Sequence, residues 1–170
     1  MLGDRVEHFG LTLEKEKSRL IEFGRFADEN SKRRNRKKPE TFTFLGFTHY
    51  CSKGRNGQFR VKRKTSKKKF NKKVKEMDKE IREKLVVLGL PAPEVVKWLN
   101  QVLVGYFHYY GISDNSEKIW DFQDKMKKLL YKWLNRRSQK RSFNWENFNC
   151  FLKDFPLVRP KIYVSIYGDK

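Results

Sequence analysis

Apolar residues recur at spacings of three and four between residues 70 and 88, and this pattern constrains the fold more than any other feature of the chain. The stripe consists of Phe70, Val74, Met77, Ile81, Leu85 and Leu88. Residues three and four apart share one face of an α-helix, so the pattern predicts an amphipathic helix whose apolar side needs other helices to cover it. Ser66 is suited to cap its start, and Gly89 with Pro91 to end it.

Three further helical segments complete the expected bundle. The second helix is expected after Pro93, with a stop at Gly111, and the third is expected to be capped by Ser113 or Ser116. A short fourth helix is expected over residues 145–153. The residues expected on the apolar faces include Trp98, Leu99, Leu103, Tyr106, Trp120, Phe122, Met126, Leu130, Trp133, Trp145, Phe148 and Leu152. The tail from residue 157 to 167 shows no clear period.

A β-hairpin is expected upstream, over residues 41–64. Its first strand carries alternating aromatic residues, and Asn56-Gly57 is a strong signal for the connecting turn. Gly46 interrupts the first strand and indicates a bulge or a close backbone approach. In the return strand, apolar Phe59 and Val61 alternate with Arg60 and Lys62, which predicts one apolar and one cationic face.

The N-terminal part reads as pieces of a sheet followed by a loop. A short helical end stopped by Gly10, strands over residues 11–13 and 19–23 and a turn at 14–17 are expected. Residues 28–40 are expected to form an open loop because their like charges repel one another. The fold class is therefore α+β, with a small antiparallel β segment in residues 1–64 and an α-helical bundle in residues 65–170.

The composition indicates a folded, strongly basic protein. Forty Lys and Arg against twenty Asp and Glu give a net charge of +20, while aromatic residues make up 15% of the chain. Disordered chains are poor in aromatics, and such an excess of cations is best tolerated beside a polyanion such as nucleic acid. The chain contains no apolar run long enough to span a bilayer and no signal-peptide core, so a cytoplasmic protein without membrane contact is expected. Cys51 and Cys150 are expected to be free thiols.

The cations are concentrated in one part of the sequence. Residues 31–75 hold eighteen of the forty Lys and Arg but a single acid, Glu40, whereas acidic and basic residues are interspersed after Met77. A solubilising coat is the plainer interpretation, but such coats usually mix the two signs. A cationic strip running from loop to hairpin to helix start fits a phosphate backbone better.

No motif for catalysis or metal binding accompanies this strip. His49 and His108 have no acid, nucleophile or metal ligand at a telling spacing, and no Gly-rich phosphate loop occurs. Among the clustered aromatics Tyr106, Phe107, Tyr109 and Tyr110, most are expected in the core, and one that points outward is a candidate for stacking on unpaired bases.

Several segments, taken in order, resemble the C-terminal part of a bacterial group II intron reverse transcriptase, or maturase. Residues 9–13 and 17–27 look like the late palm, and residues 42–50, with the Phe-Leu-Gly-Phe core, resemble the primer-grip strand pair. Residues 59–65 are similar to the return strand that leads into the thumb. The segments 98–100, 105–111, 136–139 and 160–162 resemble the maturase-specific domain, also called domain X or thumb.

This resemblance implies a helical thumb that binds intron RNA to assist splicing and holds the RNA or DNA template–primer in reverse transcription. The residues matching the primer grip are Phe44, Leu45, Gly46 and Phe47. The basic residues expected to contact RNA are Lys32, Arg33, Arg34, Arg36, Lys37, Lys38, Arg60, Lys62, Arg63, Lys64, Lys67, Lys68, Lys69, Lys72 and Lys73.

The chain also departs from the family pattern. The polymerase motif of an aromatic residue, any residue and two aspartates is absent, so no catalytic residue is assigned and the chain is predicted to be inactive as a polymerase alone. Mg²⁺ is expected only together with a palm that supplies those carboxylates. Three alternatives to a maturase fragment stay open: the non-catalytic half of a split reverse transcriptase that works with an N-terminal fingers–palm chain, a general basic nucleic-acid-binding module, and a decayed reading frame.

Overall fold

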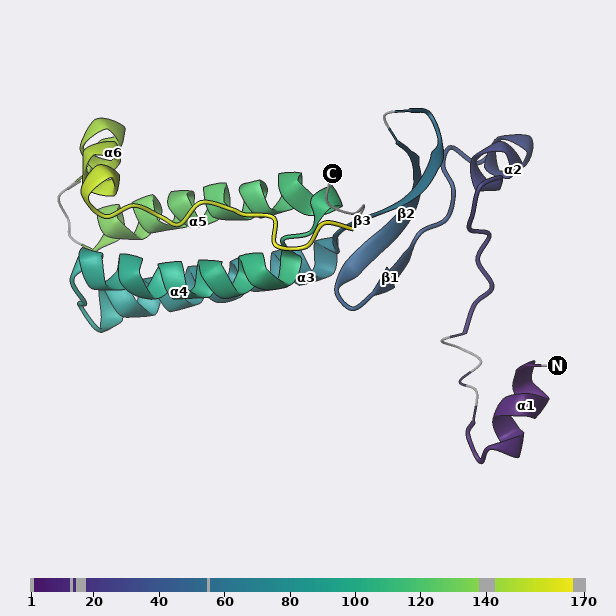
Figure 1. Ribbon diagram of the computed structural model, residues 1–170. Coiled ribbons are helices and arrows are strands. Elements are labelled where there is room, and N and C mark those ends of the chain that lie inside the picture. Colours follow the sequence, from purple (N-terminus) through teal and green to yellow (C-terminus); the bar gives the residue numbers. More distant parts are fainter. Residues whose placement is uncertain (1, 13, 15–17, 55, 138–142, 167–170) are drawn as a thin grey trace. The chain divides into compact units, whose positions relative to one another are not determined.

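The computed structural model describes residues 2–12, 14, 18–54, 56–137 and 143–166 (Figure 1). Contacts within the chain group the residues into two compact units. The first comprises residues 1–42 and 49–62, and the second comprises residues 43–48 and 63–170. The second unit contains the helical bundle, and it also holds the short segment 43–48 against that bundle.

The expected α+β class is confirmed, with a small antiparallel sheet followed by helices. Its strands are β1 (Phe42–Phe44), β2 (Phe47–Lys53) and β3 (Phe59–Thr65), in the order β1-β2-β3. The predicted hairpin is therefore present, although it contains three strands rather than two. Gly57, with a φ of 75°, lies in the turn between β2 and β3, where its amide donates to the carbonyl of Gly54.

Gly46 lies in a tight turn between β1 and β2, so the expected bulge is wrong. Both Leu45 and Gly46 have positive φ angles, 46° and 78°, as a two-residue type I′ turn requires. The alternative expectation, a close approach to the glycine backbone, is confirmed. A Cβ atom at Gly46 would lie 3.0 Å from the hydroxyl oxygen of Tyr110.

The two strands expected near the N-terminus are absent from the described residues. Helix α1 (Leu2–His8) ends before Gly10, as expected, but residues 11–12 and 18–23 form no strand; residues 13 and 15–17 lie outside the described part. Hydrogen bonds between side chains and the backbone replace the backbone–backbone hydrogen bonds of a sheet here. The amide of Glu22 donates to the Glu40 carboxylate at 3.1 Å, and Arg19 donates to the carbonyl of Thr41 at 3.0 Å.

The expected open loop at 28–40 is also partly wrong, because helix α2 (Ala27–Arg33) occupies its first half. Acidic side chains relieve the repulsion that was expected to prevent a helix. Asp28 pairs with Lys32 one turn later at 3.0 Å, and Glu22, outside the basic run, pairs with Arg34 at 2.9 Å. Residues 34–41 carry no helix.

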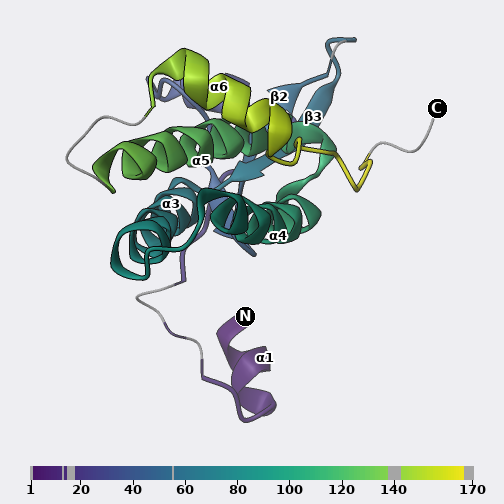
Figure 2. The ribbon, with the colours of Figure 1, turned by 90° about the vertical axis from the view of Figure 1, so that its left-hand side faces the viewer.

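The second unit contains the four predicted helices (Figures 1 and 2). They are α3 (Lys67–Arg82), α4 (Ala92–Tyr110), α5 (Ser116–Arg136) and α6 (Trp145–Asp154). Ser66 caps α3, since its hydroxyl accepts from the amide of Lys69 at 3.4 Å. The expected serine cap of α5 is wrong. Asn115, the last residue of the short 3-10 turn η2 (Ser113–Asn115), precedes that helix, and its side chain forms hydrogen bonds elsewhere.

The core of the bundle follows the predicted stripes with three exceptions. Fully buried side chains include Met77, Ile81, Leu85, Leu99, Leu103, Phe107, Phe122, Met126, Leu130, Leu134 and Phe148. Leu88 is 58% exposed because the π-helical turn η1 (Glu83–Val87) adds a residue and rotates the apolar face away. Trp120 and Trp145 are also exposed, since α5 and α6 are covered on one side only.

The tail after α6 is extended and runs back along the bundle (Figure 1, yellow). Asn100 on α4 donates to the carbonyl of Pro156 and accepts from the amide of Val158. Further along, Ile112 and Val164 form an isolated parallel bridge. None of the helices in the described part of the chain is long and apolar enough to cross a membrane.

Candidate nucleic-acid interface

The first turn of α3 concentrates positive charge. Lys67, Lys68 and Lys69 are exposed, the turn contains no acid, and none of the three forms an ion pair with a described residue. The amino end of a helix already carries a partial positive charge, so cations here are electrostatically unfavourable. An anion at this end of a helix stabilises it by about 0.3–1 kcal/mol, and each cation there destabilises it by a similar amount. A polyanion would remove this cost.

The same end of α3 borders an open hollow of about 260 Å³ against α4. Lys69, Lys72 and Lys73 line one side, with Tyr106 and Tyr110 from α4 opposite. Glu76 also lines the hollow and balances part of the charge, pairing with Lys73 at 3.5 Å and with Lys72 at 3.8 Å. Burial raises the pKa of Tyr106 well above its ordinary value, so its phenol stays neutral near pH 7.

The segment 43–48 is fixed to the bundle beside this end of α4. The hydroxyl of Tyr109 donates to the carbonyl of Leu45 at 2.9 Å, and the amide of Ser66 donates to the carbonyl of Gly46 at 2.8 Å. Phe47 stacks on Tyr109 with ring centroids 6.0 Å apart. Phe44, Leu45 and Tyr109 are left 60%, 67% and 54% exposed. The unit therefore exposes aromatic surface on the segment 43–48 and on α4, the helix that also borders the lysine-lined hollow.

The predicted orientation of the tyrosine cluster is confirmed in its main point. Tyr106 and Phe107 are buried, and Tyr110 is half-buried against Phe47 with ring centroids 5.2 Å apart. Tyr109 is the outward-pointing member. It is the most exposed of the four, and a ligand can meet only the part of its ring that Phe47 and Tyr110 leave uncovered.

The predicted RNA-contacting residues divide between the two units. The first unit holds Lys32, Arg33, Arg34, Arg36, Lys37, Lys38, Arg60 and Lys62. The second unit holds the basic residues Arg63, Lys64, Lys67, Lys68, Lys69, Lys72 and Lys73. It also holds the primer-grip matches Phe44, Leu45, Gly46 and Phe47, which lie in the segment 43–48. The basic residues of the second group lie at the end of β3 and in the first two turns of α3, whereas the primer-grip matches lie in β1, β2 and the turn between them.

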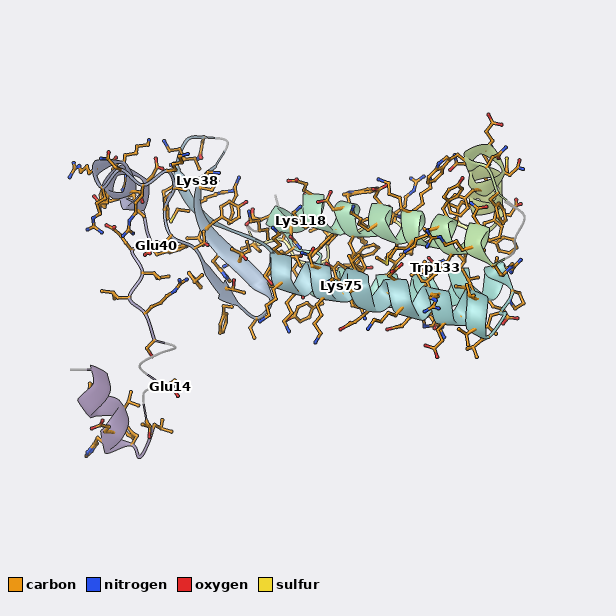
Figure 3. The ribbon with its side chains drawn as sticks, turned by 180° about the vertical axis from the view of Figure 1, so that it is seen from behind. Glu14, Lys38, Glu40, Lys75, Lys118 and Trp133 are labelled. Carbon is orange, nitrogen blue, oxygen red and sulfur yellow. The ribbon has the colours of Figure 1, made fainter. Side chains whose placement is uncertain are left out.

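Part of the basic run in the first unit is neutralised internally. Arg34 pairs with Glu22 at 2.9 Å, and Arg36 pairs with Glu40 at 3.5 Å. Lys38 and Glu40 are labelled in Figure 3. Of the run, Arg33, Lys37 and Lys38 are exposed without an ion pair in the described part of the chain. The composition of residues 31–75 does not reveal the pairing of Arg34, because Glu22 lies outside that stretch.

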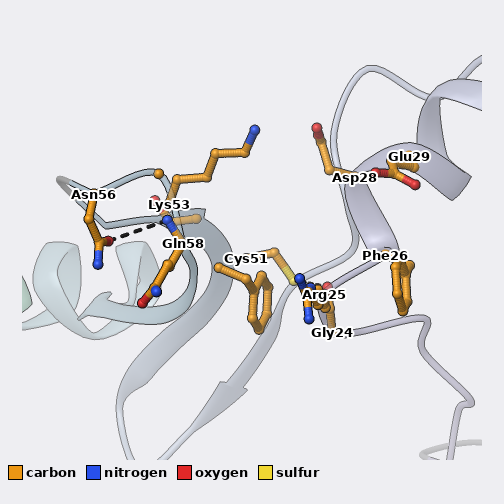
Figure 4. Close-up of a pocket in the computed structure, with 12 residues that line it drawn as sticks. Gly24, Arg25, Phe26, Asp28, Glu29, Cys51, Lys53, Asn56 and Gln58 are labelled. Atoms are coloured by element: carbon orange, nitrogen blue, oxygen red, sulfur yellow. Dashed lines mark hydrogen bonds between the residues drawn. The ribbon is translucent and has the colours of Figure 1, made fainter.

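A pocket of about 620 Å³ lies in the first unit (Figure 4). Its walls mix both signs, with Arg25 and Lys53 alongside Asp28 and Glu29. The thiol of Cys51 donates to the carbonyl of Gly24 at 3.6 Å. The pocket therefore differs in charge from the acid-free start of α3. The residues that line it include no reactive pair of side chains.

A second group of cations, which was not predicted from the sequence, lies at the far end of α3. Arg82 of α3 and Lys132 and Arg136 of α5 all lie over the indole ring of Trp133. The interspersed signs after Met77 concealed the group, because its members come from two helices. Lys132 and Arg136 are four residues apart and so share one face of a helix next to Trp133, and this spacing was the signal that could have revealed part of the group.

The remaining candidate residues have structural contacts. His108 stacks on Tyr163 with ring centroids 3.9 Å apart, and both cysteines are free thiols, as expected. Within the described residues, no three His, Cys, Asp or Glu side chains are grouped in a way that would hold a metal ion.

The fold and this surface define an α+β protein with a cationic helical unit. The family model described as "Group II intron, maturase-specific domain" matches residues 67–151, half of the chain. The chain therefore belongs to the group II intron maturase family, as the resemblance predicted. The match starts at the first residue of α3 and ends within α6. No curated protein and no solved structure gives a significant match.

Proposed function

We propose that this chain binds the RNA of a group II intron, helps that RNA to reach its splicing-active fold, and grips the template–primer during reverse transcription. The observation that carries the proposal is the first turn of α3, where three exposed lysines without a described ion pair stand at the positive end of a helix. A phosphate backbone relieves that unfavourable placement and releases its own counterions on binding.

The exposed aromatic surface supports a contact with unpaired nucleotides. Phe44 and Tyr109 are both more than half exposed on the unit that carries the lysines, although Phe47 already stacks on Tyr109. Stacking of bases on such rings is tolerant of sequence and contributes about 1–3 kcal/mol per base. Phosphate contacts from the lysines together with base or sugar contacts from the rings are what a grip on a template–primer end requires.

In this proposal the polymerase step needs a fingers–palm part that these 170 residues do not contain. The aromatic-X-Asp-Asp motif does not occur in the sequence, and two-metal phosphoryl transfer needs carboxylates to hold its cations. An N-terminal fingers–palm chain is the partner that would supply them. Mixing the two polypeptides and assaying primer extension distinguishes a split enzyme from a protein that acts on splicing alone.

RNA binding is tested by charge removal at the start of α3. The variant Lys68→Gln/Lys69→Gln is compared with Lys97→Gln/Lys153→Gln, which removes the same charge from exposed positions on α4 and α6. Affinity for a fluorescently labelled group II intron RNA transcribed in vitro is measured at 0.15 M salt. Each lost phosphate contact weakens binding roughly fivefold under the counterion-release relation, so the α3 variant is expected to bind roughly 25-fold more weakly.

Two results would contradict the proposal. Equal affinities of the α3 variant and its charge-matched control would show that the lysines act only as a coat. Equal competition by the intron RNA and by a perfectly paired RNA duplex would instead favour a general basic module, because duplex RNA is recognised mainly by shape and backbone.

A further inference from the structure

Three cations surround a single indole ring in the second unit. The Nζ atom of Lys132 lies 4.5 Å from the ring centroid of Trp133, and the Cζ atoms of Arg136 and Arg82 lie at 5.6 and 5.8 Å. Figure 3 shows Trp133 where α3 and α5 lie side by side, towards the C-terminal ends of both helices. We name these residues, together with Asp78, the Trp133 cluster.

Asp78 is the carboxylate that holds the cluster together. It accepts from the indole Nε1 of Trp133 at 2.7 Å and from Nζ of Lys132 at 2.9 Å. Burial alone would raise the pKa of Asp78, but the hydrogen bonds from Lys132 and Trp133 and the charges of Lys132 and Arg136 outweigh it, so the pKa lies below its ordinary value. Asp78 is therefore ionised, and the cluster contains one negative charge and three positive ones.

The two arginines have no described carboxylate within ion-pair distance. Both are exposed, and neither forms an ion pair in the described part of the chain. A favourable interaction with the helix dipole explains a cation at the end of a helix, and Arg136 stands in the last turn of α5. It does not explain Arg82, because the helical path continues beyond that residue through η1.

The chemistry of the cluster suits a phosphate group. A guanidinium held over an aromatic ring loses rotational freedom before binding, and the N–H donors in its plane match two phosphate oxygens. Trp133 itself is half-buried beneath these cations. The surface is thus cationic rather than apolar, whereas the cores of protein–protein interfaces are depleted in charge.

We propose that Arg82, Lys132 and Arg136 form a second phosphate-binding site for the RNA backbone, distinct from the lysines at the start of α3. The proposal rests on the RNA-binding function proposed above and adds a contact to it. Ten residues of continuous helix separate Lys72 from Arg82, which corresponds to roughly 15 Å along the axis. The two sites are therefore far enough apart to contact different phosphates, and α3 links them rigidly.

The site is tested with the double variant Arg82→Gln/Arg136→Gln of the full chain. The control is Lys97→Gln/Lys153→Gln, which removes the same total charge away from the cluster. Binding of the labelled group II intron RNA is measured between 0.05 and 0.2 M salt. If both arginines contact phosphates, the slope of log affinity against log salt becomes shallower by about 1.5–2 and affinity at 0.15 M falls roughly 25-fold; the control retains the wild-type slope.

A second variant separates loss of a phosphate contact from loss of folding. Arg82→Lys/Arg136→Lys keeps both charges but lacks the planar fork. It is expected to bind more weakly than wild type by a few-fold while melting at the same temperature. Wild-type RNA affinity in both arginine variants would overturn the second site, leaving the cluster to another partner such as an acidic protein, while the function proposed for α3 would stand. Failure of the wild-type protein to bind the RNA would remove the proposed function itself.

Discussion

Asn115 joins separate segments of the helical unit through one buried amide. Its Oδ1 accepts from the amide of Thr65 at 2.7 Å, and its Nδ2 donates to Oγ1 of Thr65 at 2.7 Å and to the carbonyl of Tyr110 at 2.9 Å. The side chain is fully buried. It therefore ties the end of β3 to the junction between α4 and α5.

Asn115→Ala is predicted to lower the free energy of unfolding by about 2–4 kcal/mol. The substitution removes the hydrogen bonds that Asn115 makes to the backbone amide and to the hydroxyl of Thr65 in the interior. Urea unfolding followed by circular dichroism measures the change. Ser116→Ala is the control, since Ser116 is exposed and makes no cap bond, and its effect should stay within about 0.5 kcal/mol. A comparable loss in both variants would argue against the role of Asn115.

Gly46 is required at its turn for two reasons, its φ of 78° and the close approach of the Tyr110 hydroxyl. Gly46→Ala is therefore expected to destabilise the unit by about 1–3 kcal/mol, from left-handed backbone strain and displacement of the tyrosine. Gly105→Ala is the matched control. Gly105 is helical and a Cβ there meets nothing within 4 Å, so that change should stabilise α4 by about 0.5–1 kcal/mol. The same sign for both substitutions, read from thermal melts, would contradict this account.

At the scale of the elements, Asp78 links α3 to α5 and makes that packing dependent on pH. Its pKa is lowered from 3.8 in the folded chain, so the carboxylate stabilises the fold above the unfolded-state value and loses this effect as the pH falls through the folded-state value. Wild type and Asp78→Asn should differ most in unfolding free energy near pH 6, and the difference should shrink below about pH 3.8. A difference that stayed constant from pH 6 to pH 2.5 would exclude the ionised link.

Helices α3 and α4 were predictable in part because local residues set one end of each. Ser66 at the start of α3 and Gly111 at the end of α4 act within their own turns. The π-turn η1 was not predictable, since no residue within or beside it indicates a π-helical turn. Its consequence, the exposure of Leu88, therefore escaped the periodic pattern.

The errors in the first unit arose from contacts distant in sequence. Helix α2 was missed because Glu22, which accepts from Asn30 at 2.6 Å and pairs with Arg34, lies outside the basic run. Residues 19–23 were expected to form a strand, but hydrogen bonds to Glu40 and Thr41 hold them in place of strand pairing. Periodicity registers the apolar pattern of a segment but not which partner satisfies its backbone.

At the scale of the whole molecule, the excess charge was evident from the sequence, whereas its arrangement was not. The run over residues 31–75 identified the lysines of α3, but it also included Arg34 and Arg36, which are paired internally. The Trp133 cluster lies outside that run and depends on the packing of α3 against α5. Net charge predicts a class of partner, and the fold determines which cations are free to meet it.

The most direct test of the central claim is the salt dependence of affinity for a group II intron RNA. If six to ten of the cations contact phosphates, affinity should fall about 10³–10⁵-fold between 0.05 and 0.2 M salt. The titration uses the full chain and the labelled RNA at constant pH. A steep linear decline in log affinity with log salt is the predicted result, and an affinity that does not change across this range would contradict the account.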